Sequence, residues 1–182
     1  MANSVYQSEK VNIRPGIITD VEKYLLTHNL GNRGFEDGSK HKQLVGLLGE
    51  IIVIEKLTGS TVNLKDRFDG FDGGFDLIYK GFRIDVKTME RKSFVRPEFI
   101  NNFYIIQQTY ISDIIIFCSY HTVANIVEIC GWIFKNDLSK LGIFYQQGTR
   151  RIRTDGSSFM FRQDNYEVQN KDLQHIHALL KL

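Results

Sequence analysis

Two continuous apolar runs, at residues 113–120 and 124–134, constrain the fold of this chain more than any other feature. They read DIIIFCSY and ANIVEICGWIF and are rich in β-branched residues. A strand with one buried face alternates apolar and polar residues, so unbroken runs of this kind are typical of strands buried on both faces. We therefore expect a sheet that is covered by other elements on each side.

The patterns around these two runs supply the covering elements. The segments expected to be helical are residues 16–30, 40–59, 98–111, 135–141 and 170–182. Of these, residues 98–111 fit a strand as well as a helix, and residues 158–168 are expected to be a further strand or extended segment. The order of elements predicts an α/β or α+β fold, with one mixed sheet flanked by helices, in a single domain that spans residues 1–182.

Residues 74–88 predict a β-hairpin with a defined register. Apolar and polar residues alternate on both sides of Lys80-Gly81, and this pair suits a two-residue turn because glycine accepts a positive φ. With this turn, the residues that face each other are Tyr79 and Phe82, Ile78 and Arg83, Leu77 and Ile84, and Asp76 and Asp85.

The last of these pairs sets two carboxylates against each other. Opposed side chains have Cβ atoms about 5 Å apart, where like charges destabilise a sheet. A divalent cation between Asp76 and Asp85 removes this repulsion, and Mg²⁺ prefers such oxygen ligands. Lys87 lies two residues along the same face, where its ammonium could orient a water. The alternative is a solvated polar face, which is common on antiparallel sheets.

A further acidic residue, Glu50, falls on the apolar helix of residues 40–59. At 100° per residue it lies among Gly46, Leu47, Val53, Ile54 and Leu57. Buried carboxylates are rare unless they are paired or bind a metal. Glu50 is therefore a candidate third ligand, and the alternative is a glutamate at the rim of the helix whose tip reaches water.

Basic residues gather in the segments 39–42, 89–96 and 148–153. The net charge of +2 permits a nucleic-acid partner without requiring one, and each segment could instead be a solvated face. As a phosphate-binding set, the candidates are Lys40, Lys42, Arg91, Lys92, Arg150, Arg151 and Arg153.

The remaining composition narrows the class of protein. Cys118 and Cys130 lie inside the two apolar runs and are expected to be buried free thiols. No apolar run approaches the roughly 20 residues that span a bilayer, and the N-terminal residues lack the apolar centre of a secretory signal. We therefore expect a cytoplasmic protein without membrane contact.

The acidic helix followed by a hairpin with the spacing D-x₈-D-V-K resembles the PD-(D/E)xK nuclease superfamily. The matching pieces are Glu50, Asp76 and Asp85-Val86-Lys87, within a region of similarity that covers residues 40–135. The resemblance implies a restriction-endonuclease-like fold with its catalytic core at residues 40–135, Mg²⁺ as cofactor with Mn²⁺ as a substitute, and DNA as the partner.

Two departures from the pattern of the family bear on the subtype. Phe75 stands where the family has a proline before the first aspartate, at a position that varies widely. Gln107 and Tyr110 miss the Q-x-x-x-Y spacing of exonuclease-like members. The sequence therefore favours an endonuclease over a processive exonuclease.

The resemblance also implies a role for each site residue. Asp76, Asp85 and the Val86 carbonyl would bind the metal, Glu50 would complete the shell, and Lys87 would position the attacking water for phosphodiester hydrolysis. Small members of the superfamily often act as dimers, so a homodimer fits as well. Two alternatives stay open: a catalytically inactive nucleic-acid-binding protein of the same fold, and an α/β protein unrelated to nucleic acid whose polar hairpin face is incidental.

Overall fold

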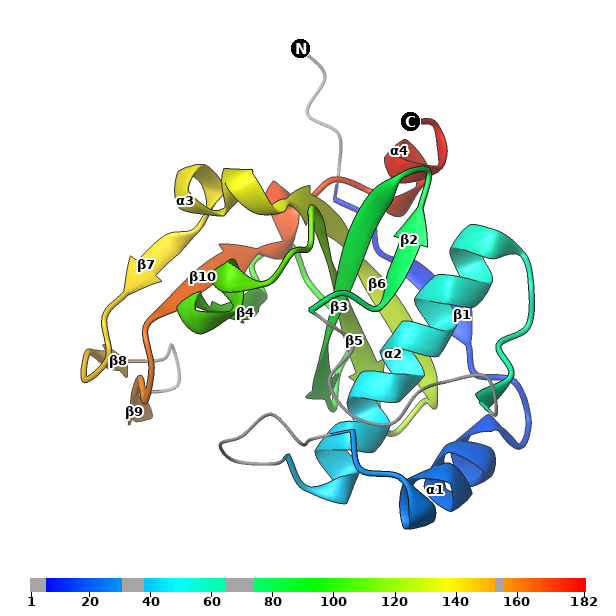
Figure 1. Cartoon of the computed structure of the whole chain (residues 1–182). Coiled ribbons are helices and arrows are strands. Elements are labelled where there is room, and N and C mark those ends of the chain that lie inside the picture. The colour runs from blue at the N-terminus through cyan, green and yellow to red at the C-terminus, as the bar shows by residue number, and fades with distance from the viewer. Residues whose placement is uncertain (1–5, 31–37, 65–73, 153–155) are drawn as a thin grey trace.

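The computed structural model describes residues 6–30, 38–64, 74–152 and 156–182 (Figure 1). The fold is mixed α/β. The strands are β1 (Glu9–Asn12), β2 (Leu77–Tyr79), β3 (Phe82–Arg91), β4 (Ile100–Tyr104), β5 (Ile114–His121), β6 (Ile126–Phe134), β7 (Ile143–Tyr145), β8 (Arg150–Ile152), β9 (Ser158–Met160) and β10 (Asn165–Gln169). The α-helices are α1 (Ile17–Thr27), α2 (Lys40–Thr58), α3 (Leu138–Leu141) and α4 (Ile176–Leu180), and the 3₁₀ segments are η2 (Ile105–Thr109), η3 (Lys135–Asp137) and η4 (Asn170–Asp172).

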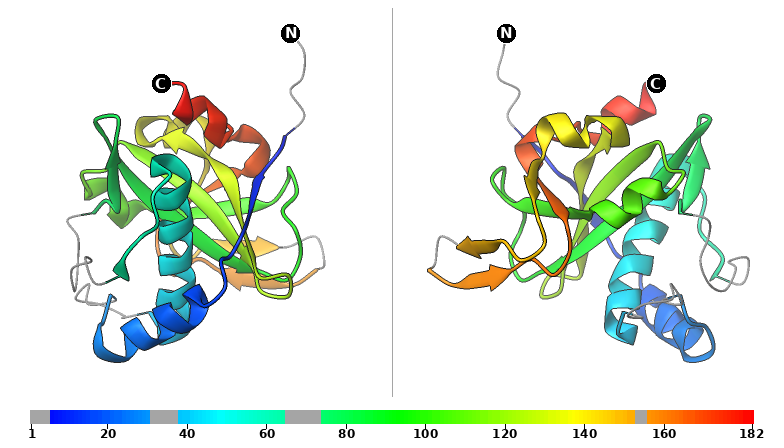
Figure 2. Two further views of the ribbon diagram at one scale, coloured as in Figure 1. Left: turned by 90° about the vertical axis from the view of Figure 1, so that its right-hand side faces the viewer. Right: turned by 60° about the vertical axis from the view of Figure 1, so that its left-hand side comes forward.

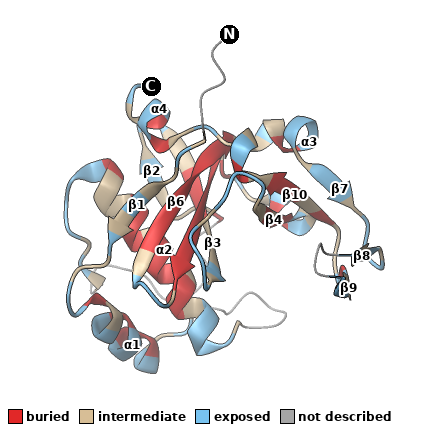
Figure 3. Ribbon diagram, turned by 180° about the vertical axis from the view of Figure 1, so that it is seen from behind, coloured by how far each residue is buried: buried red, intermediate tan, exposed pale blue. Residues whose placement is uncertain are grey.

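The main sheet has the strand order β1-β6-β5-β3-β2. Strands β3 and β5 pair in parallel, and the other neighbours pair antiparallel. Every residue of β5 is buried, as is nearly all of β6, so the prediction of strands buried on both faces is confirmed. Figure 3 shows this burial concentrated in the central strands and along α2.

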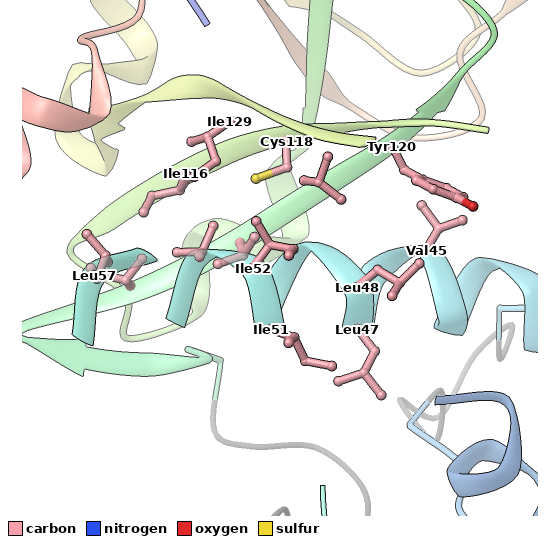
Figure 4. Packing of buried hydrophobic residues seen from close by; sticks show 14 of the residues in the cluster. Val45, Leu47, Leu48, Ile51, Ile52, Leu57, Ile116, Cys118, Tyr120 and Ile129 are labelled. Atoms are coloured by element: carbon pink, nitrogen blue, oxygen red, sulfur yellow. The ribbon is translucent and has the colours of Figure 1, made fainter. Parts of the chain in front are cut away.

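The helix α2 covers one face of the main sheet. It begins after Ser39, whose side chain accepts a hydrogen bond from the Lys42 N–H, and it ends at Gly59, which adopts φ 70°. Both ends agree with the predicted helix, because serine caps and glycine terminates helices by these means. Its side chains meet those of β5 and β6 in one apolar cluster that includes Leu48, Ile52, Ile116, Cys118 and Ile129 (Figure 4).

A second sheet, with the order β4-β10-β7, covers the opposite face. It lies across the main sheet from α2 (Figure 2). A separate apolar cluster fills this interface; its buried members are Phe103, Ile115, Phe117, Cys130, Ile133, Leu138 and Val168. Both cysteines are buried and free, as predicted.

The helix expected at residues 98–111 is wrong, because these residues form β4 and the 3₁₀ segment η2. The inward face of β4 carries Asn101 as well as Phe103, both fully buried. The Asn101 Nδ2 donates to Asn170 Oδ1 at 2.7 Å, which gives this buried donor a partner inside the protein. A polar residue on the buried face hides the period of two that would have identified the strand.

Two other expectations need correction. The closing helix was predicted from residue 170, but α4 contains only Ile176–Leu180 and is capped by His175. A single mixed sheet was also expected, whereas the strands of the described residues form three sheets, the third being the pair β8-β9. Among the described helices, none combines the length and apolar character that crossing a membrane would require.

Gly49 lets α2 lie directly against β3. A Cβ at position 49 would stand 1.8 Å from Thr88 Oγ1 and 3.0 Å from Thr88 Cβ. At Gly46, on the same helix, a Cβ would meet nothing within 4 Å. The close approach of helix and strand is thus tied to position 49, one residue before Glu50.

Gly49→Ala should therefore destabilise the protein by about 1–3 kcal/mol, because rotation of the Thr88 hydroxyl relieves only one of the tight contacts and α2 must move. Gly46→Ala is the matched control, and it should stabilise by up to about 1 kcal/mol through helix propensity alone. Urea unfolding of both variants measures the difference. Equal effects at the two positions would contradict the close packing of Gly49 on Thr88.

Candidate active site

The hairpin has the predicted register over three of its four predicted pairs, but Asp76 and Asp85 do not pair in its ladder. The pairs Leu77–Ile84, Ile78–Arg83 and Tyr79–Phe82 are all present, and the turn residues Lys80 and Gly81 have φ of 49° and 83°. Because β2 begins only at Leu77 while β3 runs on to Arg91, no strand among the described residues pairs with β3 beyond Ile84 on that side.

Asp76, the residue before β2, continues the hydrogen bonding to β3 with its backbone and its side chain. Its backbone N–H donates to the Ile84 carbonyl at 2.7 Å, and its side-chain Oδ2 accepts from the Val86 N–H at 2.6 Å. In a strand the N–H and C=O of one residue point to the same side. The Val86 carbonyl therefore points to the same edge of β3 as the Asp76 carboxylate.

Asp85 and Lys87 form an ion pair on one face of β3. The Lys87 ammonium lies 2.7 Å from Asp85 Oδ1, and the side chains are 18% and 6% exposed. These residues pair in register with Ile115 and Phe117 of β5, which belong to the cluster beneath the second sheet. Ile84 and Val86 belong to the cluster beneath α2. Asp85 and Lys87 thus face away from α2.

These contacts change the interpretation of the opposed carboxylates. We expected their repulsion to require a cation between them. Instead, Asp85 is paired with the Lys87 ammonium and Asp76 is held by the Val86 N–H, so each carboxylate has a partner in the protein. The fold alone can hold both groups, and metal binding has to be judged from the chemistry of the donors.

Glu50 lies on α2, the helix on the other face of β3. It is half-buried, as are Gly46 and Ile54 beside it, whereas Leu47 and Val53 on the same side are fully buried. It therefore stands at the border of the apolar face rather than in its middle. Its neighbour Gly49 contacts β3 at Thr88, one residue beyond Lys87. The structure thus brings together Asp76 with Val86 and Asp85 with Lys87, and it places Glu50 across β3 from that ion pair.

Lys135 is a cation near this site that sequence reasoning missed. It directly follows β6, its N–H donates to the Asp113 carbonyl at 3.0 Å, and its ammonium donates to the Tyr110 carbonyl. Burial lowers the pKa of Lys135, and the nearby charge of Asp85 opposes that shift. A second ammonium therefore lies within electrostatic reach of Asp85. No local signal marks it, because its position depends on the pairing of β5 with β6.

Arg83, two residues before Asp85 on the same face, is held by Asp113. The Arg83 backbone N–H and Nε each donate to Asp113 Oδ2 at 2.9 Å, and Nη2 donates to Oδ1 at 2.7 Å. These bonds lower the pKa of Asp113 to about 2. Arg83, Asp113 and Ser112 line a hollow of about 640 Å³ at this end of the sheet.

The lowered pKa of Asp113 predicts a pH dependence of stability. An unfolded aspartate titrates near 3.9, so the contribution of the ion pair is fully present above about pH 4 and is lost as the pH falls through about 2. Asp113→Asn should be less stable than wild type at pH 7, with a gap that closes towards pH 2. Urea midpoints at pH 7, 4 and 2.5 measure it. The control is Asp137→Asn, in an exposed pair with Lys140, and its urea midpoint should differ only slightly from that of wild type. A difference between Asp113→Asn and wild type that stayed constant with pH would contradict this account.

The basic candidates fall into two groups. Lys40 and Lys42 are exposed in the first turn of α2, and this turn is joined to the end of β3 by the contact of His41 with Glu90 at 2.7 Å. Lys92, just after β3, is exposed as well. These three lysines therefore share one region of the surface.

The arginines are more engaged with the protein. Arg91 is half-buried over the Phe99 ring and donates to the Ile100 carbonyl at 2.6 Å, and burial lowers its pKa. Arg151 donates to Glu167 at 3.1 Å, whereas Arg150 beside it is exposed on β8. Figure 1 places β8 on the far side of the main sheet from α2. Arg153 lies outside the described residues.

Comparison with known proteins adds no relative to this description. No family model, curated protein or solved structure matches the chain. The case for a function therefore rests on the geometry above and on the resemblance of the motif.

The donor set suits a hard cation. The Asp76 carboxylate and the Val86 carbonyl lie at the edge of β3 and Asp85 lies on the adjoining face. All three offer oxygen, which Mg²⁺ prefers over nitrogen or sulfur ligands. Lys87 is near the surface, so its ammonium could move from Asp85 to an incoming anion. These residues could hold a cation next to a movable positive charge.

Proposed function

We propose that this protein is a metal-dependent nuclease with a restriction-endonuclease-like fold that hydrolyses phosphodiester bonds in DNA. One observation carries the proposal: the Asp76 carboxylate accepts from the Val86 N–H at the edge of β3, next to the Asp85–Lys87 ion pair. The fold alone can hold these groups, so the proposal is supported by their chemistry, which sets oxygen donors beside an ammonium. The motif D-x₈-D-V-K supplies the same residues in the order typical of the superfamily.

Asp76, Asp85 and the Val86 carbonyl would hold Mg²⁺, and Glu50 would contribute to the site from α2. The ion would supply Lewis-acid polarisation of the phosphate and a more acidic water. Lys87 leaves its ion pair with Asp85, orients the attacking water and offsets charge on the scissile phosphate. Lys40, Lys42 and Lys92 contact the backbone of the DNA without reading sequence.

A specific observation favours a second candidate, a protein of the same fold that binds nucleic acid without cutting it. Asp85 is only 4% exposed and already paired with Lys87 at 2.7 Å. A cation has to displace the Lys87 ammonium from this carboxylate or share the carboxylate with it. A site in which the metal never replaced Lys87 would be inactive. The two candidates differ in one measurable property, which is metal-dependent cleavage.

The test is a cleavage assay on supercoiled, linear duplex, single-stranded and branched DNA with Mg²⁺, Mn²⁺, Ca²⁺ or chelator. The proposal predicts cutting in Mg²⁺ and Mn²⁺, and linear or nicked product from the supercoiled circle, since an endonuclease needs no free end. DNA binding without cleavage on every substrate would support the inactive binder. If the protein neither binds nor cleaves any of these DNAs, nucleic acid is not part of its function.

A further inference from the structure

A second group of metal-ligating side chains joins residues from near the two ends of the chain. Glu9 of β1, His175 and His177 place one ligand atom each within 4.8 Å of one another. Glu9 Oε2 lies 3.6 Å from His177 Nε2, and the two imidazole rings have centroids 4.7 Å apart. None of these residues belongs to the site on β3.

The strand β6 holds both parts of this group in place. Glu9 pairs with Ile129 in the antiparallel ladder of β1 and β6. Farther along β6, Trp132 exchanges two backbone hydrogen bonds with Gln174, at 2.8 and 2.9 Å, and its indole N–H donates to the His175 carbonyl at 3.1 Å. The backbone beside each ligand is therefore fixed to one rigid strand, which lowers the cost of bringing the ligands together.

Gly131 is what lets the C-terminal segment reach β6. It adopts φ 144°, and a Cβ there would stand 2.6 Å from the Gln174 carbonyl oxygen. The close backbone approach at this glycine sets the position of His175, the next residue along.

The local structure at the start of α4 also brings the imidazoles of His175 and His177 close to each other. On a continuous helix, two side chains that are two residues apart do not face each other, so His175 and His177 could not share a ligand. In the structure α4 begins only at Ile176, and His175 precedes it with an extended backbone of φ −67° and ψ 144°. His175 is thus outside the helix, and the helical spacing that would separate the two rings does not apply.

We propose that Glu9, His175 and His177 form a Zn²⁺ site that is separate from the acidic site on β3. Two imidazoles and one carboxylate are a common zinc ligand set, and nitrogen donors select zinc over magnesium. Three protein ligands leave a fourth position for water. Because the ion would join the first strand to the last helical segment, it would also stabilise the folded chain.

Two contacts limit the affinity of this site. The Lys56 ammonium is paired with Glu9 Oε1 at 2.5 Å, so a positive charge stands beside the cation. His175 Nδ1 accepts from the His177 N–H at 3.2 Å, and coordination through Nε2 would place the ring proton on Nδ1 and replace that bond. At 3.2 Å the bond is at the long end of the range, so its loss costs little. Lys56→Gln should therefore tighten zinc binding.

The test uses untagged full-length protein, titrated with ZnCl₂ or MgCl₂ and followed by calorimetry and thermal melting. To exclude binding at β3, the titrations are repeated in Asp85→Asn. Zn²⁺ should raise the melting temperature in both backgrounds, and Mg²⁺ should not raise it in Asp85→Asn. His177→Ala and Glu9→Gln should each weaken zinc binding by roughly 10–100-fold or more.

The matched control is His41→Ala. His41 also contacts a glutamate, Glu90, at 2.7 Å, but within the described residues this pair is not part of a group of three possible ligands. Its loss should leave zinc affinity unchanged. The proposal is overturned if wild type shows no zinc-dependent shift, if His177→Ala binds as tightly as wild type, or if Asp85→Asn alone abolishes binding. None of these outcomes bears on cleavage by the site on β3.

Discussion

Asp85→Asn should abolish Mg²⁺-dependent cleavage of DNA. The substitution keeps the size of the side chain but removes the charge that binds the cation, and Asp85 is too buried for a neighbour or a water to replace it easily. It also leaves Lys87 without its carboxylate partner at 2.7 Å, so we expect a loss of stability of about 1–3 kcal/mol, the usual cost of an unsatisfied buried group. Cleavage is measured at a temperature where unfolding assays show the variant to be folded.

The control for this variant is Asp137→Asn, which makes the same chemical change in a more exposed residue that lines the hollow beside Arg83 and Asp113. It should cleave like wild type. Retained cleavage by folded Asp85→Asn would mean that the cation is bound elsewhere, and the proposed active site would be wrong.

Lys87→Ala should reduce cleavage by on the order of 10²–10³-fold, the typical loss for an electrostatic group that acts on the transition state. Its effect on metal binding should be opposite to that of Asp85→Asn. Lys87 is the ion-pair partner of Asp85, so its removal takes away a competing positive charge, and Mg²⁺ affinity should hold or rise. Calorimetric titration with Mn²⁺ and a single-turnover cleavage assay measure the two effects separately.

DNA affinity in Ca²⁺ separates catalysis from binding. It should change little in Lys87→Ala, because one cationic contact among several is lost. Lys140→Gln, an exposed lysine paired with Asp137, is the control and should bind and cleave normally. If Lys87→Ala loses activity only in proportion to lost DNA binding, Lys87 is a phosphate contact and not a positioning group.

Features that depend on neighbouring residues could be predicted from the sequence. The turn at Lys80-Gly81 and the alternation around it gave the hairpin register, and this register placed Asp76 beside β3. The unbroken runs at residues 113–120 and 124–134 gave two buried strands. In each case the determining interactions lie within a few residues, or the burial is so complete that composition reveals it.

Features that depend on distant packing could not be predicted. The strand β4 was mistaken for a helix because Asn101 is buried through its bond to Asn170, far away in the chain. In the same way, the sequence predicts a metal ion as the partner of Asp85. Nothing in the residue spacing shows that the Lys87 side chain folds back onto the Asp85 carboxylate. Lys135 enters the site only through the pairing of β5 with β6.

The bond from the Val86 N–H to the Asp76 carboxylate makes one amide a spectroscopic probe of the site. Its 2.6 Å length should move the amide proton resonance downfield and slow its exchange with solvent. Protonation of Asp76, or its recruitment by a cation, withdraws electron density from the accepting oxygen, and the resonance moves accordingly. Selective ¹⁵N labelling of valine, with the Val86 resonance assigned among the eleven valines, would therefore report occupancy of the site without any substrate, even in a protein that cuts nothing.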